Sequence, residues 1–240
     1  MKILAIDSSG LVASVAVAQD DTLVAEFTMN YKKTHSQTLL PMLEEVKKAI
    51  QLDLGSIDAI AVAAGPGSFT GLRIGSATAK GLGLALQKPL IAVPTVEALA
   101  YNLYDTGEDT VICPIMDARR NQVYTGIYCF REHQLETLKQ QDAVPMEELL
   151  EELNEMGKTV IFLGDGVPVY REQIEENCRV PYTFAPAHLN RQRAAAVAAL
   201  GEIYYKEGKI QTAAEHAPDY LRVSQAERER AQRLGKADHA

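Results

Sequence analysis

A glycine-rich stretch at residues 65–75, GPGSFTGLRIG, constrains the fold of this chain more than any other feature. It follows the apolar run 57–64 and precedes a long segment rich in alanine, glycine and leucine, an order that predicts a strand, a loop and a helix. Such a loop can turn backbone N–H groups and a helix N-terminus towards an anion. It can equally be a tight corner whose glycines let another part of the structure pack closely. The sequence leaves both alternatives open at this point.

Composition limits the classes of protein to which the chain can belong. Its 240 residues are 47% hydrophobic, enough for one large domain or two small ones. The net charge of -8 argues against autonomous binding of nucleic acid, although a basic partner could supply the missing positive surface. Cys113, Cys129 and Cys178 form no CxxC pair, so no disulfide framework is expected. Without a signal-peptide pattern or a run of eighteen apolar residues, a soluble, cytoplasmic protein with no membrane partner is expected.

One order of elements occurs twice along the chain. A strand ends on Asp7, and a second strand ends on Asp117; each is followed by a turn and another strand. Further on, a strand runs into Gly65 in the first half and into Gly164 in the second, and a helix follows each glycine loop. This repeat predicts an α/β protein with a duplicated actin-like (ribonuclease H-like) ATPase fold, in which each lobe has a mixed sheet flanked by helices.

The boundaries of the lobes are predicted from the polar break around residues 105–109. The expected lobes are 1–108 and 109–223, and residues 224–240 are expected to form a flexible polar tail. Helices are expected over 36–50, 70–86, 95–103 with Thr95 as the N-cap, 168–176 and 189–206.

The two strand-ending acids are the first candidates for chemistry. In an actin-like ATPase they would face each other across the cleft, where Asp7 and Asp117 could hold magnesium through water. They could instead cap the backbone of the following turns, which is the commoner role of such acids. The turns themselves, Ser8-Ser9-Gly10 and 118–121, contain a single glycine and give a triphosphate little room.

Other catalytic arrangements find little support. The five histidines are far apart and no pair has the spacing of a metal site. Ser68 does not lie between two glycines, as the nucleophile of a hydrolase elbow would. The sequence therefore predicts neither a metal centre nor a serine nucleophile.

Small residues recur along the helix that follows the glycine loop. Gly71, Gly75 and Ala79 form one series at four-residue spacing, and Ala77, Gly81 and Ala85 form another. A glycine inside a helix costs about 1 kcal/mol relative to alanine, so a close contact should offset it. That contact could be a helix of a partner or the sheet of the same lobe.

Several motifs together resemble the TsaB family of tRNA threonylcarbamoyladenosine biosynthesis. They are the glycine stretch 65–75, the opening Ile-Asp-Ser-Ser at 6–9, DARRNQVY at 117–124, Gly-Asp-Gly at 164–166 and PDYLR at 218–222. The resemblance extends from residue 1 to about 223, and it implies an actin-like fold that has largely lost catalysis. The catalytic relative TsaD carries a His-x-x-x-His metal motif, whose histidines align here with Thr95 and Leu99. Neither side chain can bind a metal as imidazole does.

The resemblance also implies the partners and the surfaces used. The chain is expected to have no catalytic residue and no cofactor of its own, and to act as a dimerisation subunit that binds TsaD. TsaE would join a ternary complex, a homodimer would form when TsaD is absent, tRNA would be contacted only indirectly, and ATP or ADP would lie at most at the subunit seam. The expected interface residues are Leu39, Leu40, Leu43, Phe69, Thr70, Leu72, Arg73, Gly75, Ser76, Ala79 and Gly83. A vestigial nucleotide or anion site would consist of Asp7, Ser8, Ser9, Asp117 and Arg119. The alternative function is that of an independent ATP-binding actin-like phosphotransferase or ATPase.

Overall fold

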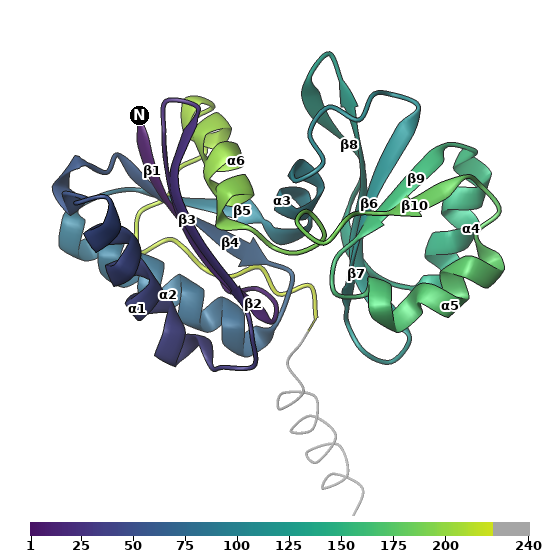
Figure 1. Cartoon of the computed structure of the whole chain (residues 1–240), viewed down its shortest axis with the longest axis horizontal. Coiled ribbons are helices and arrows are strands. Elements are labelled where there is room, and N and C mark those ends of the chain that lie inside the picture. Colours follow the sequence, from purple (N-terminus) through teal and green to yellow (C-terminus); the bar gives the residue numbers. More distant parts are fainter. Residues whose placement is uncertain (223–240) are drawn as a thin grey trace, which may run out of the picture.

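The computed structural model of the chain describes residues 1–222, which form two five-stranded sheets with helices on both sides (Figure 1). The first sheet consists of β1 (Lys2–Asp7), β2 (Val12–Gln19), β3 (Thr22–Asn30), β4 (Ala59–Gly65) and β5 (Leu90–Pro94). The second consists of β6 (Thr110–Asp117), β7 (Gln122–Arg131), β8 (Gln134–Pro145), β9 (Thr159–Leu163) and β10 (Tyr182–Phe184). The helices are α1 (His35–Ala49), α2 (Phe69–Leu86), α3 (Thr95–Tyr101), α4 (Met146–Met156), α5 (Val167–Asn177) and α6 (Ala194–Lys206), with a short 3-10 turn at Leu54–Ser56.

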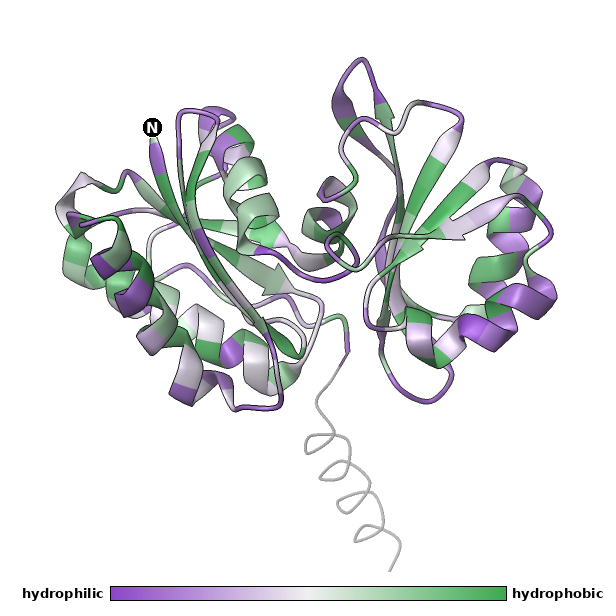
Figure 2. Cartoon of the chain, viewed as in Figure 1, coloured by the Kyte–Doolittle hydropathy of each residue, from purple (hydrophilic) through white to green (hydrophobic). Residues whose placement is uncertain are grey.

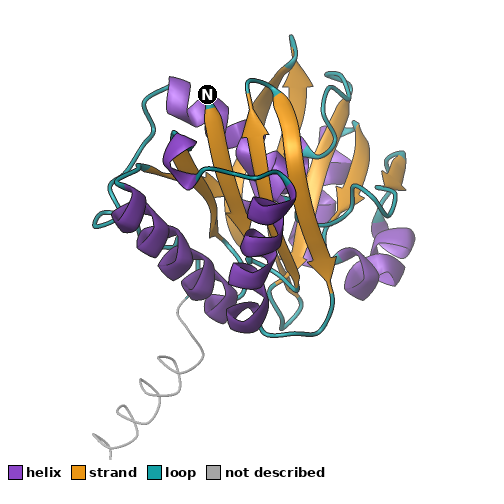
Figure 3. Ribbon diagram, turned by 60° about the vertical axis from the view of Figure 1, so that its left-hand side comes forward, coloured by secondary structure: helices purple, strands orange, loops and turns teal. Residues whose placement is uncertain are grey.

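The two sheets have the same topology, which confirms the predicted duplication. The strand order is β3-β2-β1-β4-β5 in the first sheet and β8-β7-β6-β9-β10 in the second. In each sheet the first three strands along the chain form an antiparallel meander, and the last two run parallel to the first of these strands. The central strands are apolar along most of their length, because helices cover both faces of each sheet (Figures 2 and 3).

Four apolar clusters join these layers. α1 and α2 pack on one face of the first sheet, and α6 packs on the other. α4 and α5 cover the outer face of the second sheet. The short helix α3 packs on both sheets, because Ala98 joins the α6 cluster while Val96 and Leu99 lie against β6 and β7. This helix therefore forms the apolar contact between the lobes.

Some elements differ from expectation. β8, α4 and β10 were not predicted, and α3 ends at Tyr101 rather than at residue 103. Thr95 is not the N-cap of α3, since Pro94 holds that position and the Thr95 hydroxyl accepts a hydrogen bond from the Gly65 N–H at 3.2 Å. The last helix begins at Ala194 rather than at residue 189, because residues 189–193 belong to the segment that passes from the second lobe back to the first.

The chain returns to the first lobe after this crossing. α6 packs on β1 and β2, and Gln211 pairs with Leu90 at the edge of β5. The division into 1–108 and 109–223 stays a prediction, and any division has to accommodate the packing of residues 194–211 on the first sheet. The predicted tail, 224–240, lies outside the described residues.

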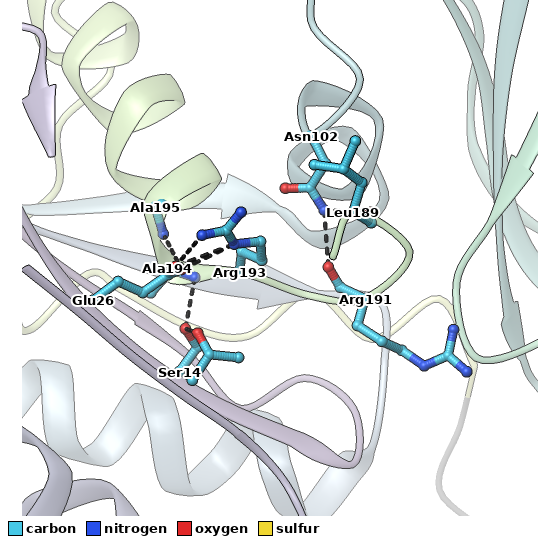
Figure 4. Close-up of polar contacts among 9 residues, drawn as sticks. Ser14, Glu26, Asn102, Leu189, Arg191, Arg193, Ala194 and Ala195 are labelled. Atoms are coloured by element: carbon cyan, nitrogen blue, oxygen red, sulfur yellow. Dashed lines mark hydrogen bonds and ion pairs between the residues drawn. The ribbon is translucent and has the colours of Figure 1, made fainter. Parts of the chain in front are cut away.

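Polar contacts fix the crossing segment in place (Figure 4). Asn102, directly after α3, donates hydrogen bonds to the carbonyl groups of Leu189 at 3.1 Å and Arg191 at 2.8 Å. The free N–H groups at the start of α6 are capped from the first sheet: Ser14 Oγ accepts from Ala194 at 2.8 Å, and the Glu26 carboxylate accepts from Ala195 at 3.1 Å. Glu26 also pairs with Arg193. An acid at a helix N-terminus is favourable, so β3 both caps and anchors α6.

We predict that Glu26→Ala lowers the free energy of unfolding by about 2 kcal/mol, because it removes an N-terminal cap and leaves Arg193 without its partner. Urea denaturation followed by circular dichroism measures this change. The control Glu44→Ala removes exposed ion pairs within α1 and should change the unfolding free energy by less than about 0.5 kcal/mol. Equal effects of the two substitutions would contradict the anchoring role of Glu26.

Candidate functional site: the cleft between the lobes

A cleft of about 660 Å³ lies between the two lobes. The β1–β2 turn, the glycine loop and the first turn of α2 form its first-lobe wall. The β6–β7 turn and Asp165 form the opposite wall, and residues 219–222 complete it. Its lining residues are Ser9, Gly10, Leu11, Pro66, Gly67, Ser68, Phe69, Thr70, Leu72, Met116, Asp117, Ala118, Arg119, Arg120, Tyr124, Asp165, Asp219, Tyr220, Leu221 and Arg222.

The glycine loop packs directly on the β1–β2 turn beneath this cleft. Ser8 Oγ donates to the Gly71 carbonyl at 2.9 Å, and the Ser68 N–H donates to the Ser9 carbonyl at 2.7 Å. A Cβ atom at Gly71 would overlap Ser8 O, and one at Gly75 would overlap Ser8 Oγ. Gly71 and Gly75 therefore accommodate a turn of the same chain.

Asp7 lies under the cleft rather than in it. Its side chain is buried, and its Oδ1 accepts hydrogen bonds from the Ser9 N–H at 2.9 Å and the Ser9 hydroxyl at 2.7 Å. Burial raises the pKa of Asp7 from 3.8 to about 6, although the Ser9 hydrogen bonds oppose the shift. The carboxyl group therefore caps the turn, and it ionises less readily than an exposed aspartate.

Asp117 is exposed and lines the cleft. Its Oδ1 accepts from the Arg119 N–H at 2.8 Å, and its own N–H donates to Asp165 Oδ1 at 3.3 Å. Burial raises the pKa of Asp165, which is a second acid close to this turn. Arg119 and Arg120 both have positive φ, which holds the turn in a tight left-handed conformation without a glycine.

The residues expected to bind an anion are only partly brought together. Ser9, Asp117 and Arg119 line the cleft, whereas Asp7 and Ser8 are buried below it. The cleft residues that the expected site did not include comprise, among others, Arg120, Tyr124, Asp165, Asp219, Tyr220 and Arg222. These residues lie in the sequence motifs at 117–124, 164–166 and 218–222. The sequence showed the motifs, but only the fold brings them together at one cleft.

Burial divides the expected interface residues into two groups. Inside the chain lie Leu39, Leu43, Leu72, Gly75, Ser76, Ala79 and Gly83. On the surface lie Leu40, Thr70 and Arg73, with Phe69 half-buried. The exposed face of α2 continues through the second small series, Ala77, Gly81 and Ala85, and through Leu84.

Ser68 and the residues aligned with metal ligands have structural roles. Ser68 is the N-cap of α2, and its Oγ accepts from the Gly71 N–H at 3.3 Å. Thr95 and Leu99 are buried in α3. Within residues 1–222, no three His, Cys, Asp or Glu side chains are arranged as a metal site. None of the helices in this part of the chain has the length and apolar character needed to cross a bilayer.

Two matching sheets with a cleft between them define a protein of the actin-like ATPase fold. The family model described as TsaD, tRNA N6-adenosine threonylcarbamoyltransferase, matches residues 22–230. The tRNA threonylcarbamoyladenosine biosynthesis protein TsaB of Bacillus subtilis is 36% identical over 227 residues, covering 95% of this chain and 96% of its own. TsaB of Escherichia coli is 33% identical over 167 residues, covering 69% and 72%. A solved structure of YeaZ from Pseudomonas aeruginosa has 27% identity and a TM-score of 0.77, covering 92% of this chain and 99% of its own.

The chain therefore belongs to the TsaB family of tRNA threonylcarbamoyladenosine biosynthesis proteins. It is a member of the TsaD/TsaB tRNA modification system, as the sequence motifs indicated.

We predict that Asp7 makes stability depend on pH. The pKa of Asp7 is higher in the folded chain, about 6, than its ordinary value of 3.8. Its stabilising contribution is therefore fully present below about pH 4 and is lost as the pH rises through 6. Asp7→Asn should remove this dependence. When the pH is raised from 4.5 to 7.5, the unfolding free energy of the unsubstituted chain should therefore fall by about 2 kcal/mol relative to that of Asp7→Asn.

Urea denaturation at the two pH values measures the difference. Asp117→Asn serves as the control, because it makes the same substitution at the exposed acid that ends β6; in this variant the pH dependence due to Asp7 should remain. Parallel pH profiles for the unsubstituted chain and Asp7→Asn would contradict the buried, partly protonated state of Asp7.

Proposed function

We propose that this chain is a non-catalytic subunit that binds TsaD and orders it for transfer of the threonylcarbamoyl group to the adenosine next to the anticodon in tRNA. The observation that carries the proposal is the exposed face of α2, where Ala77, Gly81 and Ala85 form a smooth series of small residues. Gly81 has no neighbouring atom within 4 Å of the position where a Cβ would lie. Unlike Gly71 and Gly75, it accommodates no described part of this chain.

The exposed face of α2 has the character of a helix-packing surface. A glycine at the centre of an exposed helix costs about 1 kcal/mol relative to alanine, and closely packed helix backbones can offset that cost. Leu84 on α2 is 68% exposed, and Leu40 on the neighbouring α1 is 55% exposed. Apolar side chains around a smooth small-residue surface favour a partner helix. Thr70 and Arg73 extend the same surface towards the cleft.

The strand-ending acids support a role without catalysis. Asp7 is buried below the cleft and its Oδ1 already accepts hydrogen bonds from Ser9, so of the two acids only Asp117 lines the cleft. The opposite turn contains no glycine, and Arg119 and Arg120 form part of the cleft wall. The cleft therefore lacks the pair of facing carboxylates expected of a site for a magnesium-bound triphosphate.

The resemblance to the TsaB family suggests the remaining partners. A second copy of this chain would use the α1–α2 surface as well, so homodimer and TsaD heterodimer would exclude each other. TsaE would join at the seam between the subunits, where any ATP or ADP would bind. The net charge of -8 supports indirect rather than direct contact with tRNA. A subunit that acts on tRNA would work in the cytoplasm.

We predict that Gly81→Leu abolishes binding to TsaD while the chain itself stays folded. The leucine has space in the free chain and removes the helix-glycine cost, so the unfolding free energy should rise by about 0.5–1 kcal/mol. In the complex it would separate the helices, and the dissociation constant measured by isothermal titration should increase at least about 100-fold.

The matched control is Glu172→Leu, which adds the same apolar side chain to an exposed position on α5 of the other lobe. It should leave TsaD affinity unchanged. Gly75→Leu is unsuitable for this purpose, because its side chain would collide with Ser8 and disturb the fold. An unchanged affinity for Gly81→Leu would overturn the assignment of the surface.

The alternative function, an independent actin-like phosphotransferase or ATPase, gives the opposite expectation for nucleotide. We predict that calorimetric titration of the isolated chain with Mg–ATP yields no micromolar binding. Micromolar affinity that is lost in both Asp7→Ala and Asp117→Ala would establish the alternative instead, because those carboxylates would then hold the magnesium ion.

A further inference from the structure

Residues 218–222 cross the cleft from one lobe to the other, where Figure 1 draws the last coloured part of the chain passing below β4 towards the second lobe. On the first-lobe side, the Asp219 N–H donates to the Ala64 carbonyl at 2.7 Å, next to the glycine loop. The Tyr220 ring lies against the Phe69 ring with a centroid distance of 4.8 Å. The segment is therefore attached to the end of β4 and to the start of α2.

The same residues are attached to the second lobe. Gln141 on β8 donates from Nε2 to Asp219 Oδ2 at 2.9 Å. Arg222 donates from Nη1 to the carbonyl of Ala118, in the β6–β7 turn, at 2.6 Å. Asp219 thus contacts one lobe through its backbone and the other through its side chain, so the lobes cannot separate at the cleft without breaking these contacts.

The first lobe provides a shaped recess for this segment. Gly65 has a φ of +125°, and a Cβ at that position would overlap the Asp219 carbonyl oxygen. No side chain other than glycine's hydrogen combines that backbone conformation with so close an approach. The glycine that ends β4 therefore serves the crossing segment, whereas Gly71 and Gly75 serve the β1–β2 turn.

An aromatic contact connects the crossing segment to the surface of α2. Phe69 is the first residue of α2, and its ring contacts both the Tyr220 ring and the Arg73 guanidinium, whose Cζ is 4.0 Å from the ring centroid. Thr70 and Arg73 are exposed on the same first turn. A change in the position of residues 219–222 would therefore alter the packing of Phe69 and Arg73 at the cleft end of the exposed α2 face.

The position of the attachment determines its mechanical effect. The apolar contact between the lobes is made by α3, and the crossing chain is fixed beside it by Asn102. If one lobe rotates against the other, α3 is the contact about which it would turn, and this rotation would open the cleft. Residues 219–222 bridge the lobes across the cleft, so they resist this motion.

We propose that residues 218–222 act as a releasable strap that holds the cleft closed and couples its opening to the first turn of α2. Its bonds to the second lobe are few and lie at half-buried or exposed side chains, so they can break without loss of either core. The strap requires neither a nucleotide nor TsaD, and its test is independent of the proposed partner.

The double substitution Gln141→Ala with Arg222→Ala tests the strap, because it removes both side-chain bonds to the second lobe. Each hydrogen bond shifts an opening equilibrium by about fivefold, so the ratio of open to closed cleft should rise roughly 25-fold. Small-angle scattering should show a larger radius of gyration. Amides of β1 and β6 should keep their protection, which demonstrates that both sheets remain folded.

The control combines Gln140→Ala and Arg179→Ala, exposed side chains of the same types that make no bond to the strap. It should behave as the unsubstituted chain in both measurements. If the double variant does not fold, Gln141→Ala alone provides the same comparison, with an expected fivefold shift towards the open cleft. An unchanged radius of gyration in the folded variant would overturn the proposal, since the strap would then restrain no motion.

Discussion

The contact between the β1–β2 turn and the first half of α2 is the constraint on which the other features of the first lobe depend. Ser8 and Ser9 approach the helix so closely that Gly67, Gly71 and Gly75 have no space for a side chain. This approach fixes the angle at which α2 leaves the sheet. It therefore determines which face of α2 is buried, which face is exposed, and where the floor of the cleft lies.

A similar backbone approach occurs in the second lobe. Gly164 and Gly166 lie against the Ile115 carbonyl, and a Cβ at Gly164 would overlap that oxygen. The helix that follows is shorter in this lobe: α5 has 11 residues and α2 has 18. The duplicated corner is thus present twice, but only the first lobe extends it into a long helix with a series of small residues on its exposed face. This asymmetry is consistent with a binding function located on the first lobe.

Local patterns predicted the repeated part of the fold well. The strand that ends on an acid, the turn, and the strand followed by a glycine loop each depend on neighbouring residues, so both lobes could be recognised from the chain. β8 and α4 were not predicted, and neither was the packing of α6 on the first sheet. Alternation of polar residues along β8 leaves it half-exposed, and the N-terminal cap of α6 comes from Ser14 and Glu26, far away in the sequence.

The site was less predictable than the fold, because burial is decided by tertiary packing. A series of small residues predicts close contact but not its partner. Gly75 and Gly81 are six residues apart on one helix, yet the first meets Ser8 and the second has open space. Likewise, Asp7 and Asp117 occupy equivalent positions in the repeat, but one is buried and the other exposed. The strap joins residues near 65, 118, 141 and 219, and no local pattern relates these positions.

We propose that the chain acts in tRNA modification by offering the α1–α2 surface to TsaD. Hydrogen–deuterium exchange of the chain, alone and saturated with TsaD, distinguishes this surface from the rest of the molecule. New protection is expected across α2 (Phe69–Leu86) and α1 (His35–Ala49), with α4 and α5 unchanged. Protection confined to α4 and α5, or none anywhere in the first lobe, would contradict it.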